Sequence, residues 1–245
     1  MNTRKSLGLG AAGAVVALMV TLGAAPANAV TDDSPITVDS FQEQLEAEAA
    51  ASSEAATELT KFEELSASDQ QKLVDYLLDP EVSAAFEYTA QTGESVSIEN
   101  GDVQTSVDVE TVSAPATTNA SVGSGLSAQS SVAAARTEYN VTANYVVEQR
   151  ILGVLITKLS QRFKYVTGNG VVLRTSSCTA AALNFNFTVA LDSSVSYYML
   201  AGGKAQCDIV WKGYIAYKGS GIRIDKIQSM VVNGPGVVSR TLRNV

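Results

Sequence analysis

The stretch "CTAAALNFNFTVALDSS", residues 178–194, carries the pattern that decides the fold class. Over residues 183–191 every second residue is apolar, and the residues between them carry no charge. Such alternation is typical of a β-strand with one face in a core and one face outside it. We therefore expect the apolar residues to form one inner face of a β-sandwich. The other face, with Asn184, Asn186 and Thr188, is open to two interpretations, a solvated surface or a site for a neutral ligand.

Two cysteines, Cys178 and Cys207, lie in this part of the chain. An even pair of cysteines in an exported protein predicts a disulfide. Trp211 has the same strand parity as Cys207, so both side chains should point to one face. A tryptophan beside a disulfide is a known core feature of sandwiches. A platform for stacking a sugar is the alternative role for Trp211.

Further short alternating segments lie at 139–147, 155–165 and 205–217, and glycine-containing turns separate the strands of this half. No helical periodicity competes with them. Short strands at this spacing predict an antiparallel all-β sandwich, Ig-like or jelly-roll-like, over residues 136–245.

The preceding region, residues 30–112, has helical patterns. A lightly packed helix is expected over 41–65, where the apolar stripe is thin. Ser68 resembles a helix N-cap, and Pro80 ends one helix and sits near the start of the next. Asn100-Gly101 between two alternating segments predicts a β-hairpin. The expected fold class is therefore α+β overall, with a helical segment and one hairpin before the sandwich.

Two segments are expected to lie outside these folded parts. Residues 113–135 are uncharged and rich in Ser, Ala, Thr and Gly, which predicts a linker. Residues 1–29 combine Arg4 and Lys5, an apolar run and Ala27-Asn28-Ala29, which predicts a signal peptide cleaved after Ala29. The alternative is a membrane anchor. Cleavage would leave no transmembrane anchor and a protein that is secreted, extracellular or cell-wall associated.

Charge is distributed unevenly along the chain. Residues 30–135 carry 20 acidic and two basic side chains, whereas residues 136–245 carry 13 basic and five acidic ones. The asymmetry suggests an intramolecular contact between the two halves. One alternative function follows from it, in which the acidic half is an autoinhibitory or propeptide-like arm on the basic β domain.

The sequence lacks the residues that many catalytic sites require. It contains no histidine, which excludes histidine-based acid–base catalysis, Ser-His-Asp triads and nearly every zinc hydrolase site. It shows no phosphate-binding or dinucleotide-binding glycine motif. We expect no metal, no cofactor and no enzymatic activity. A histidine-free hydrolase that uses paired carboxylates is the remaining catalytic alternative.

Three basic residues, Lys158, Arg162 and Lys164, share the outward face of one expected strand. They indicate either a site for a polyanion, such as a cell-wall polymer or an acidic glycan, or a solvated strand protected by its charges. Nucleic acid is not expected, because no array of aromatic and basic residues accompanies them.

The layout of the chain resembles secreted proteins of unknown function from high-GC Gram-positive (actinobacterial) bacteria. The resemblance covers the signal peptide, "KFEELSASDQQKLVDYLLDPEV", the Ser/Ala linker, "CTAAALNFNF" and "AQCDIVWKGYI". It implies a secreted or envelope-associated setting and no particular activity. The leading hypothesis is an exported non-catalytic binding or structural module, whose partner is a cell-wall polymer, a glycan or another envelope protein.

Overall fold

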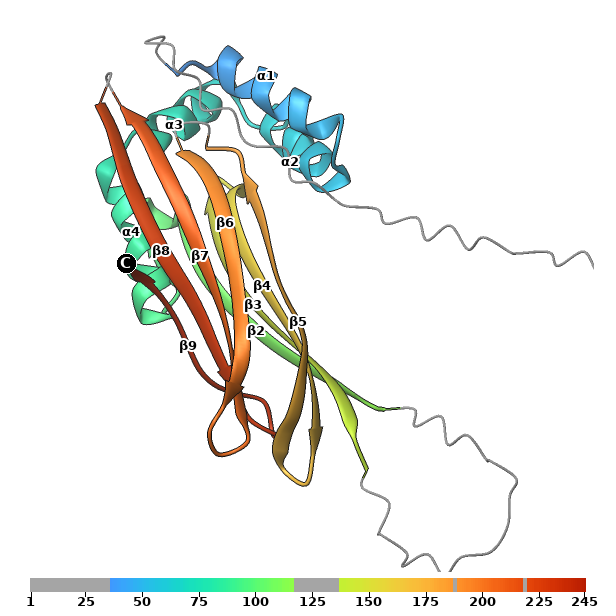
Figure 1. Ribbon diagram of the computed structural model, residues 1–245. Helices are drawn as coiled ribbons and strands as arrows, with labels where there is room; N and C mark the ends of the chain where they lie inside the picture. Colours follow the sequence, from blue (N-terminus) through green and yellow to red (C-terminus); the bar gives the residue numbers. More distant parts are fainter. Residues whose placement is uncertain (1–35, 117–136, 187–188, 218–219) are drawn as a thin grey trace, which may run out of the picture.

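The computed structural model describes residues 36–116, 137–186, 189–217 and 220–245, which form four helices and two antiparallel sheets (Figure 1). Sheet A contains β1 (Val96–Ile98), β2 (Val103–Pro115), β3 (Tyr139–Ile151), β4 (Val154–Gly168) and β5 (Val171–Asn184). Sheet B contains β6 (Val189–Leu200), β7 (Lys204–Tyr217), β8 (Ser220–Val232) and β9 (Val237–Asn244). The expected α+β class with a layered pair of sheets is confirmed. The predicted signal peptide lies outside the described residues.

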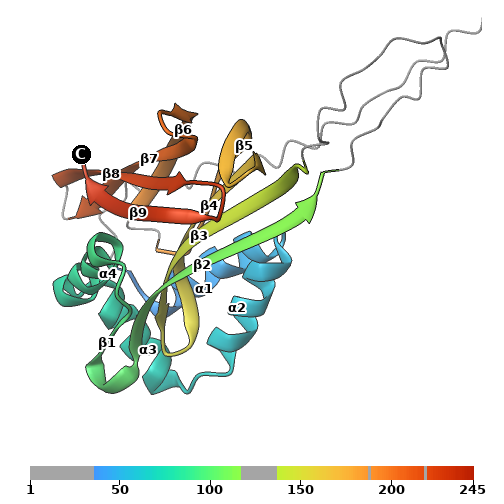
Figure 2. The ribbon, with the colours of Figure 1, turned by 90° about the horizontal axis from the view of Figure 1, so that it is seen from below.

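Neighbouring strands in each sheet are also neighbours in the chain. The chain changes sheets once, between β5 and β6. This meander differs from the Greek-key connections of Ig-like and jelly-roll sandwiches. The sandwich therefore has two lateral edges, one where β5 and β6 lie and one where β2 and β9 lie (Figure 2).

The predicted hairpin at Asn100-Gly101 is confirmed, since β1 and β2 are antiparallel with Ile98 opposite Val103. Its second strand extends into the segment that was expected to be linker. β2 continues to Pro115 and pairs with β3 along its whole length, from Val103 opposite Ile151 to Pro115 opposite Tyr139. Residues 113–115, which the sequence assigned to the linker, are therefore strand. The acidic region supplies two strands of sheet A.

The helices are α1 (Val38–Ala49), α2 (Ser53–Glu63), α3 (Ala67–Leu77) and α4 (Pro80–Thr92). The single helix expected over 41–65 is wrong, because Ser52 caps a second helix there by accepting a hydrogen bond from the backbone N–H of Ala55. The N-cap of α3 is Ser66 rather than Ser68. Pro80 is the first residue of α4, in agreement with the sequence.

Helices α1 to α3 are not lightly packed. Phe41 and Phe62 are fully buried, with ring centroids 5.1 Å apart in an edge-to-face arrangement. They belong to a core that also contains the end of the β3–β4 hairpin, including Ile151, Leu155 and Ile156. The thin apolar stripe is sufficient because the hairpin supplies the rest of the hydrophobic surface.

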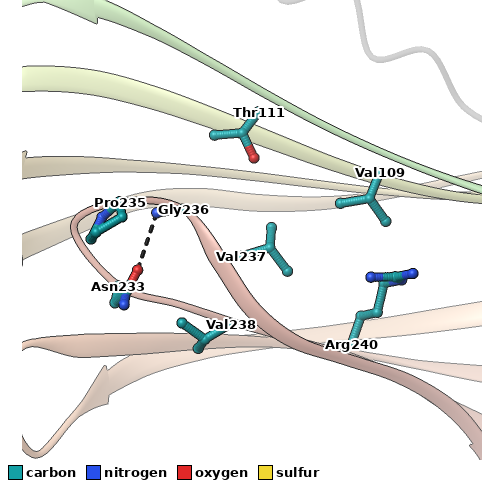
Figure 3. Close-up of a pocket in the computed structure, with 8 residues that line it drawn as sticks. All are labelled: Val109, Thr111, Asn233, Pro235, Gly236, Val237, Val238 and Arg240. Carbon is teal, nitrogen blue, oxygen red and sulfur yellow. Dashed lines mark hydrogen bonds between the residues drawn. The ribbon is translucent and has the colours of Figure 1, made fainter.

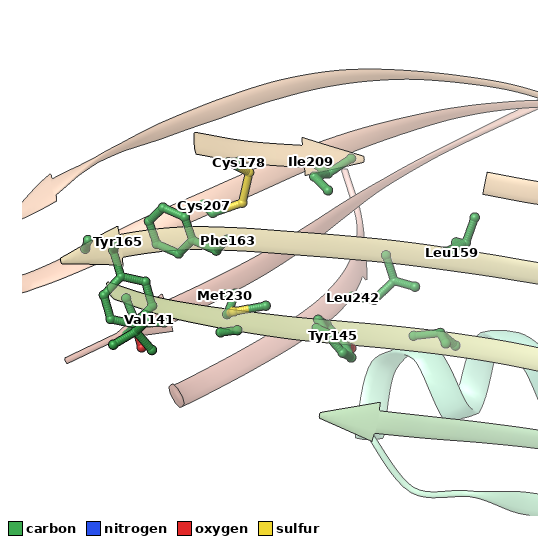
Figure 4. Packing of buried hydrophobic residues seen from close by; sticks show 14 of the residues in the cluster. Val141, Tyr145, Leu159, Phe163, Tyr165, Cys178, Cys207, Ile209, Met230 and Leu242 are labelled. Atoms are coloured by element: carbon green, nitrogen blue, oxygen red, sulfur yellow. A yellow bond between two sulfur atoms is a disulfide. The ribbon is translucent and has the colours of Figure 1, made fainter. Parts of the chain in front are cut away.

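A second core fills the space between the two sheets (Figure 4). The predicted disulfide is confirmed and joins Cys178 on β5 to Cys207 on β7, with Cα atoms 6.0 Å apart. Trp211 is buried in the same core as Cys207, which confirms the expected parity.

Two glutamines cross this core. The amide of Gln228 donates to the carbonyl of Tyr145 over 3.2 Å, and the amide of Gln161 donates to the carbonyl of Cys207 over 2.7 Å.

The continuous strand expected over 183–191 is wrong. β5 ends at Asn184 and β6 begins at Val189, so this stretch is the crossover between the sheets. The Asn184 amide donates to the carbonyls of Asn186 and Val189 over 3.0 and 2.6 Å. Phe185 is buried in the core that contains Phe41 and Phe62, whereas Leu191 packs against the core between the two sheets. The alternating residues therefore serve two cores.

Among the described residues, no helix is both long enough and apolar enough to cross a membrane.

Candidate functional site

A partly open pocket of about 140 Å³ lies where α4 meets the strands of both sheets. Its apolar walls are formed by Phe86 of α4, Leu159 of β4, Leu191 of β6 and Trp211 of β7. The indole N–H of Trp211 donates to Gln228 Oε1 over 2.8 Å, which fixes the orientation of the ring. The pocket, called the Trp211 pocket below, is therefore an apolar recess beside the crossover.

Uncharged polar groups also line this pocket. Gln149 donates to the carbonyl of Val82 over 3.0 Å, and the Thr157 hydroxyl donates to Asn184 Oδ1 over 3.0 Å. Both polar side chains are thus held by structural hydrogen bonds. Asn184 and Asn186, which the sequence marked as candidates, both line the pocket. Asn184 has a structural role in the crossover, and Thr188 lies outside the described residues.

A three-residue polar cluster lies at the pocket. Lys226 of β8 donates to Glu87 of α4 over 2.9 Å and to Asn244 of β9 over 2.8 Å, and the Asn244 amide also donates to Glu87 over 2.8 Å. The hydrogen bond from Lys226, followed by that from Asn244, lowers the pKa of the Glu87 carboxyl. The cluster attaches α4 to sheet B.

Acidification is expected to remove the stabilising effect of Glu87. A carboxyl with a lowered pKa stabilises the folded state above its ordinary pKa, and that stabilisation is lost as the pH falls through the lowered value. Because Glu87 is 39% exposed, Glu87→Gln should cost at most about 1 kcal/mol at neutral pH. Urea unfolding over a pH series should show this difference shrinking toward zero in acid. A difference that stays constant would contradict the assignment.

The predicted basic residues lie on the outer face of sheet A, away from the pocket, and acidic groups lie among them. Lys158 forms ion pairs with Glu54 of α2 at 2.8 Å and Glu148 of β3 at 3.6 Å. Arg162 donates to Asn144 over 3.1 Å. Lys164 is exposed. The pairing of Lys158 weakens the case for a polyanion site, which stays a prediction.

Asp208 on β7, for which the sequence indicated no role, is buried. The Gln206 amide donates to its carboxylate over 2.8 Å, the Tyr198 hydroxyl donates over 3.2 Å, and the Ser229 hydroxyl also contacts it. Burial, followed by the negative charge of Asp208, raises the pKa of Tyr198. These residues come from three neighbouring strands, so only the strand register brings them together.

A larger groove of about 540 Å³ lies between β2 and β9 (Figure 3). It is more open than the Trp211 pocket and is formed largely by the β8–β9 turn, where the N–H of Gly236 donates to Asn233 Oδ1 over 3.1 Å. Val109 and Arg240 face it from the two strands (Figure 3). Its walls offer less enclosure for a ligand than those of the Trp211 pocket.

The acidic groups of the Trp211 pocket bear on the alternative of a hydrolase with paired carboxylates. Glu87 is the one carboxylate among its described lining residues, whereas a glycosidase of the common type uses two facing carboxylates. In the described part of the chain, no three Asp, Glu or Cys side chains are grouped as metal ligands would be.

No protein-family model matches the chain. No curated protein and no solved structure matches it either.

Proposed function

We propose that this chain is an exported, non-catalytic binding module of the cell envelope or extracellular space, and that the Trp211 pocket is its binding site. The observation that carries the proposal is the partly open apolar recess with Phe86, Leu159, Leu191 and Trp211 as walls. An apolar pocket with a few convergent polar groups is the usual form of a ligand site.

The size of the pocket defines the ligand class. A volume of about 140 Å³ is below the range of sites for drug-sized molecules and suits one small group, such as a benzene-sized ring. Its lining amides and hydroxyls are uncharged, and its two charged lining residues, Glu87 and Lys226, neutralise each other in an ion pair at 2.9 Å, which favours a neutral ligand. We therefore propose that the module binds a single aromatic or branched aliphatic group presented by an envelope protein or polymer.

The disulfide supports the exported setting. It joins the two sheets and lies in the sandwich core, with Cys207 fully buried. Structural disulfides persist in oxidising compartments. This agrees with the signal peptide predicted from residues 1–29.

Trp211 gives a direct test because it is the single tryptophan of the chain. Titration with benzene or isobutylbenzene is expected to change the Trp211 emission and to raise the melting temperature, since a ligand that binds only the folded state stabilises it. Leu191→Phe should fill the pocket and weaken the fluorescence response about tenfold or more.

Leu78→Phe is the matched control, because Leu78 is 44% exposed and does not line the pocket. This variant should bind the probes like the wild type. A wild-type protein whose fluorescence and melting temperature do not change at saturating probe would contradict the proposal. Equal weakening by both variants would also contradict it.

A second candidate is the autoinhibitory arm, now limited to α1–α3, because β2 is an integral strand of sheet A. It is favoured by ion pairs of α2 with the basic region, Glu54 with Lys158 at 2.8 Å and Glu58 with Arg150 at 3.6 Å. On this proposal the helices cover the basic region around Lys158 and Arg150, so loosening them should strengthen binding of a polyanion, whereas a purely structural helical segment should leave that binding unchanged or weaker.

A further inference from the structure

Strand β6, at one margin of sheet B, is exposed on both of its faces. All residues from Asp192 to Met199 are exposed. Val195, Tyr197 and Met199 are 41%, 44% and 42% exposed, although their register partners on β7 are fully buried, namely Ile209, Cys207 and Ala205. These three side chains therefore lie on the core face of sheet B without the cover that the core face normally has.

The cause of this exposure lies in sheet A. The disulfide ties β5, the last strand of sheet A, to β7 rather than to β6. The β5 side chains that pack toward sheet B are small, such as Ala180 and Ala182. The Tyr197 ring still touches the core, 6.4 Å from the ring of Phe163 between centroids. An apolar strip of β6 is thus left open beside the disulfide.

The backbone edge of β6 is also free. Within the described residues, β6 pairs with β7 alone. From Ser193 to Gly203 the chain has no charge and no proline, and these are the usual devices that prevent edge-to-edge pairing. The free edge of β2 differs, because it carries Asp108 and Glu110 and ends at Pro115.

We propose that β6 is a self-association edge, at which a second copy of this chain adds as an antiparallel strand. A twofold axis at Tyr197 would place Tyr197 opposite itself and Val195 opposite Met199 of the other copy. Like charges in directly opposite positions destabilise a strand pair, and this register would place none opposite each other. Sheet B would continue across the dimer, and each apolar strip would cover the other. This is an isologous interface.

The test is the oligomeric state of residues 30–245, which include every residue that the structure describes. Sedimentation velocity is expected to show a dimer whose fraction rises with concentration. Tyr197→Lys and Tyr197→Glu should each weaken dimerisation about tenfold or more, because like charges then meet at the twofold axis. An equimolar mixture of the two variants should dimerise again, because opposite charges then meet.

Two further variants keep the test sharp. Ser196→Lys and Ser196→Glu alter an exposed position of the same strand. The two copies of residue 196 would lie diagonally across the twofold axis, about 7–8 Å apart, so these variants should show a smaller loss and recovery in the same direction even if the Tyr197 variants fold poorly. Val112→Lys, at a 52% exposed position on β2, should dimerise like the wild type. A wild-type protein that stays monomeric at millimolar concentration would overturn the proposal. Dimers that survive all four β6 substitutions, or mixtures that fail to recover, would overturn it equally.

Discussion

The double variant Cys178→Ala/Cys207→Ala is expected to lose about 3–4 kcal/mol of its free energy of unfolding. The two cysteines are 29 residues apart in the chain, and a disulfide that closes a loop of this length restricts the unfolded chain by about that amount. Alanine is chosen over serine because Cys207 is fully buried, and a serine there would bury an unpaired hydroxyl. The loss is large against the 5–15 kcal/mol of a typical domain.

Unfolding in guanidinium chloride, followed by circular dichroism, measures the effect. The reduced wild type is the matched control, because it lacks the cross-link but retains both sulfur atoms. We expect it to lose most of the same free energy, with the remaining difference due to the small cavity in the double variant. An unchanged denaturation midpoint in both proteins would contradict a stabilising role for the bond.

The second large effect is expected at Glu58, which is only 3% exposed. Its Oε2 accepts a hydrogen bond from the backbone N–H of Leu155 at 2.8 Å, and its Oε1 lies 2.8 Å from Lys61 Nζ and 3.6 Å from Arg150 Nη1. Glu58→Ala would leave the buried N–H without an acceptor. It would also remove the counter-charge of Lys61 and one of two carboxylate partners of Arg150, which keeps Glu148 at 3.3 Å. We expect a loss of about 3 kcal/mol, at the low end for breaking a buried pair because both bases keep access to water.

Two matched variants separate the causes. Glu58→Gln keeps an acceptor for Leu155 and should lose less than Glu58→Ala. Glu54→Gln, one helical turn away, removes an ion pair to Lys158 from a side chain that is 44% exposed, and should cost less than about 1 kcal/mol. Amide hydrogen exchange at Leu155 should accelerate in Glu58→Ala. Equal losses in the Glu54 and Glu58 variants would contradict the importance of burial.

The two effects describe different attachments in the molecule. The disulfide ties the sheets together near the free edge of β6. Glu58 ties the helical segment to the β3–β4 hairpin. Loss of the first should therefore loosen the sandwich and the β6 edge, whereas loss of the second should loosen α1–α3 while the sandwich stays paired. Hydrogen exchange measured segment by segment would distinguish these results.

Where a turn residue, a proline or the cysteine count marked the chain, the sequence predicted the feature correctly. Asn100-Gly101 marks a turn because both residues tolerate the left-handed conformation, and both have a positive φ in the structure. Pro80 begins α4 because proline needs no hydrogen-bond partner at the first turn of a helix. The pairing of Cys178 with Cys207 followed from compartment and count, since the chain has no other cysteine.

The candidate site was predicted only in part. Asn184, Asn186 and Trp211 were marked by their residue types, and the fold brings them to one pocket. Phe86, Leu159 and Leu191 were not, because each appears in the sequence as an ordinary apolar residue of a helix or strand. Their shared wall comes from elements far apart in the chain, and no local pattern reports that proximity.

The sequence by itself predicted the general order of helices and strands and many of the inward-facing residues, because period and turn residues are local properties. It missed the break between α1 and α2 and the extension of β2 to Pro115. Only the tertiary structure decided that β2 pairs with β3 across residues 117–136, that residues 178–194 contain a crossover rather than one strand, and that β6 remains open. Strand partners are chosen by the summed burial and hydrogen bonding of residues distant in sequence. An alternating pattern is compatible with many partners, and with a change of sheet at Phe185, until the whole core is assembled.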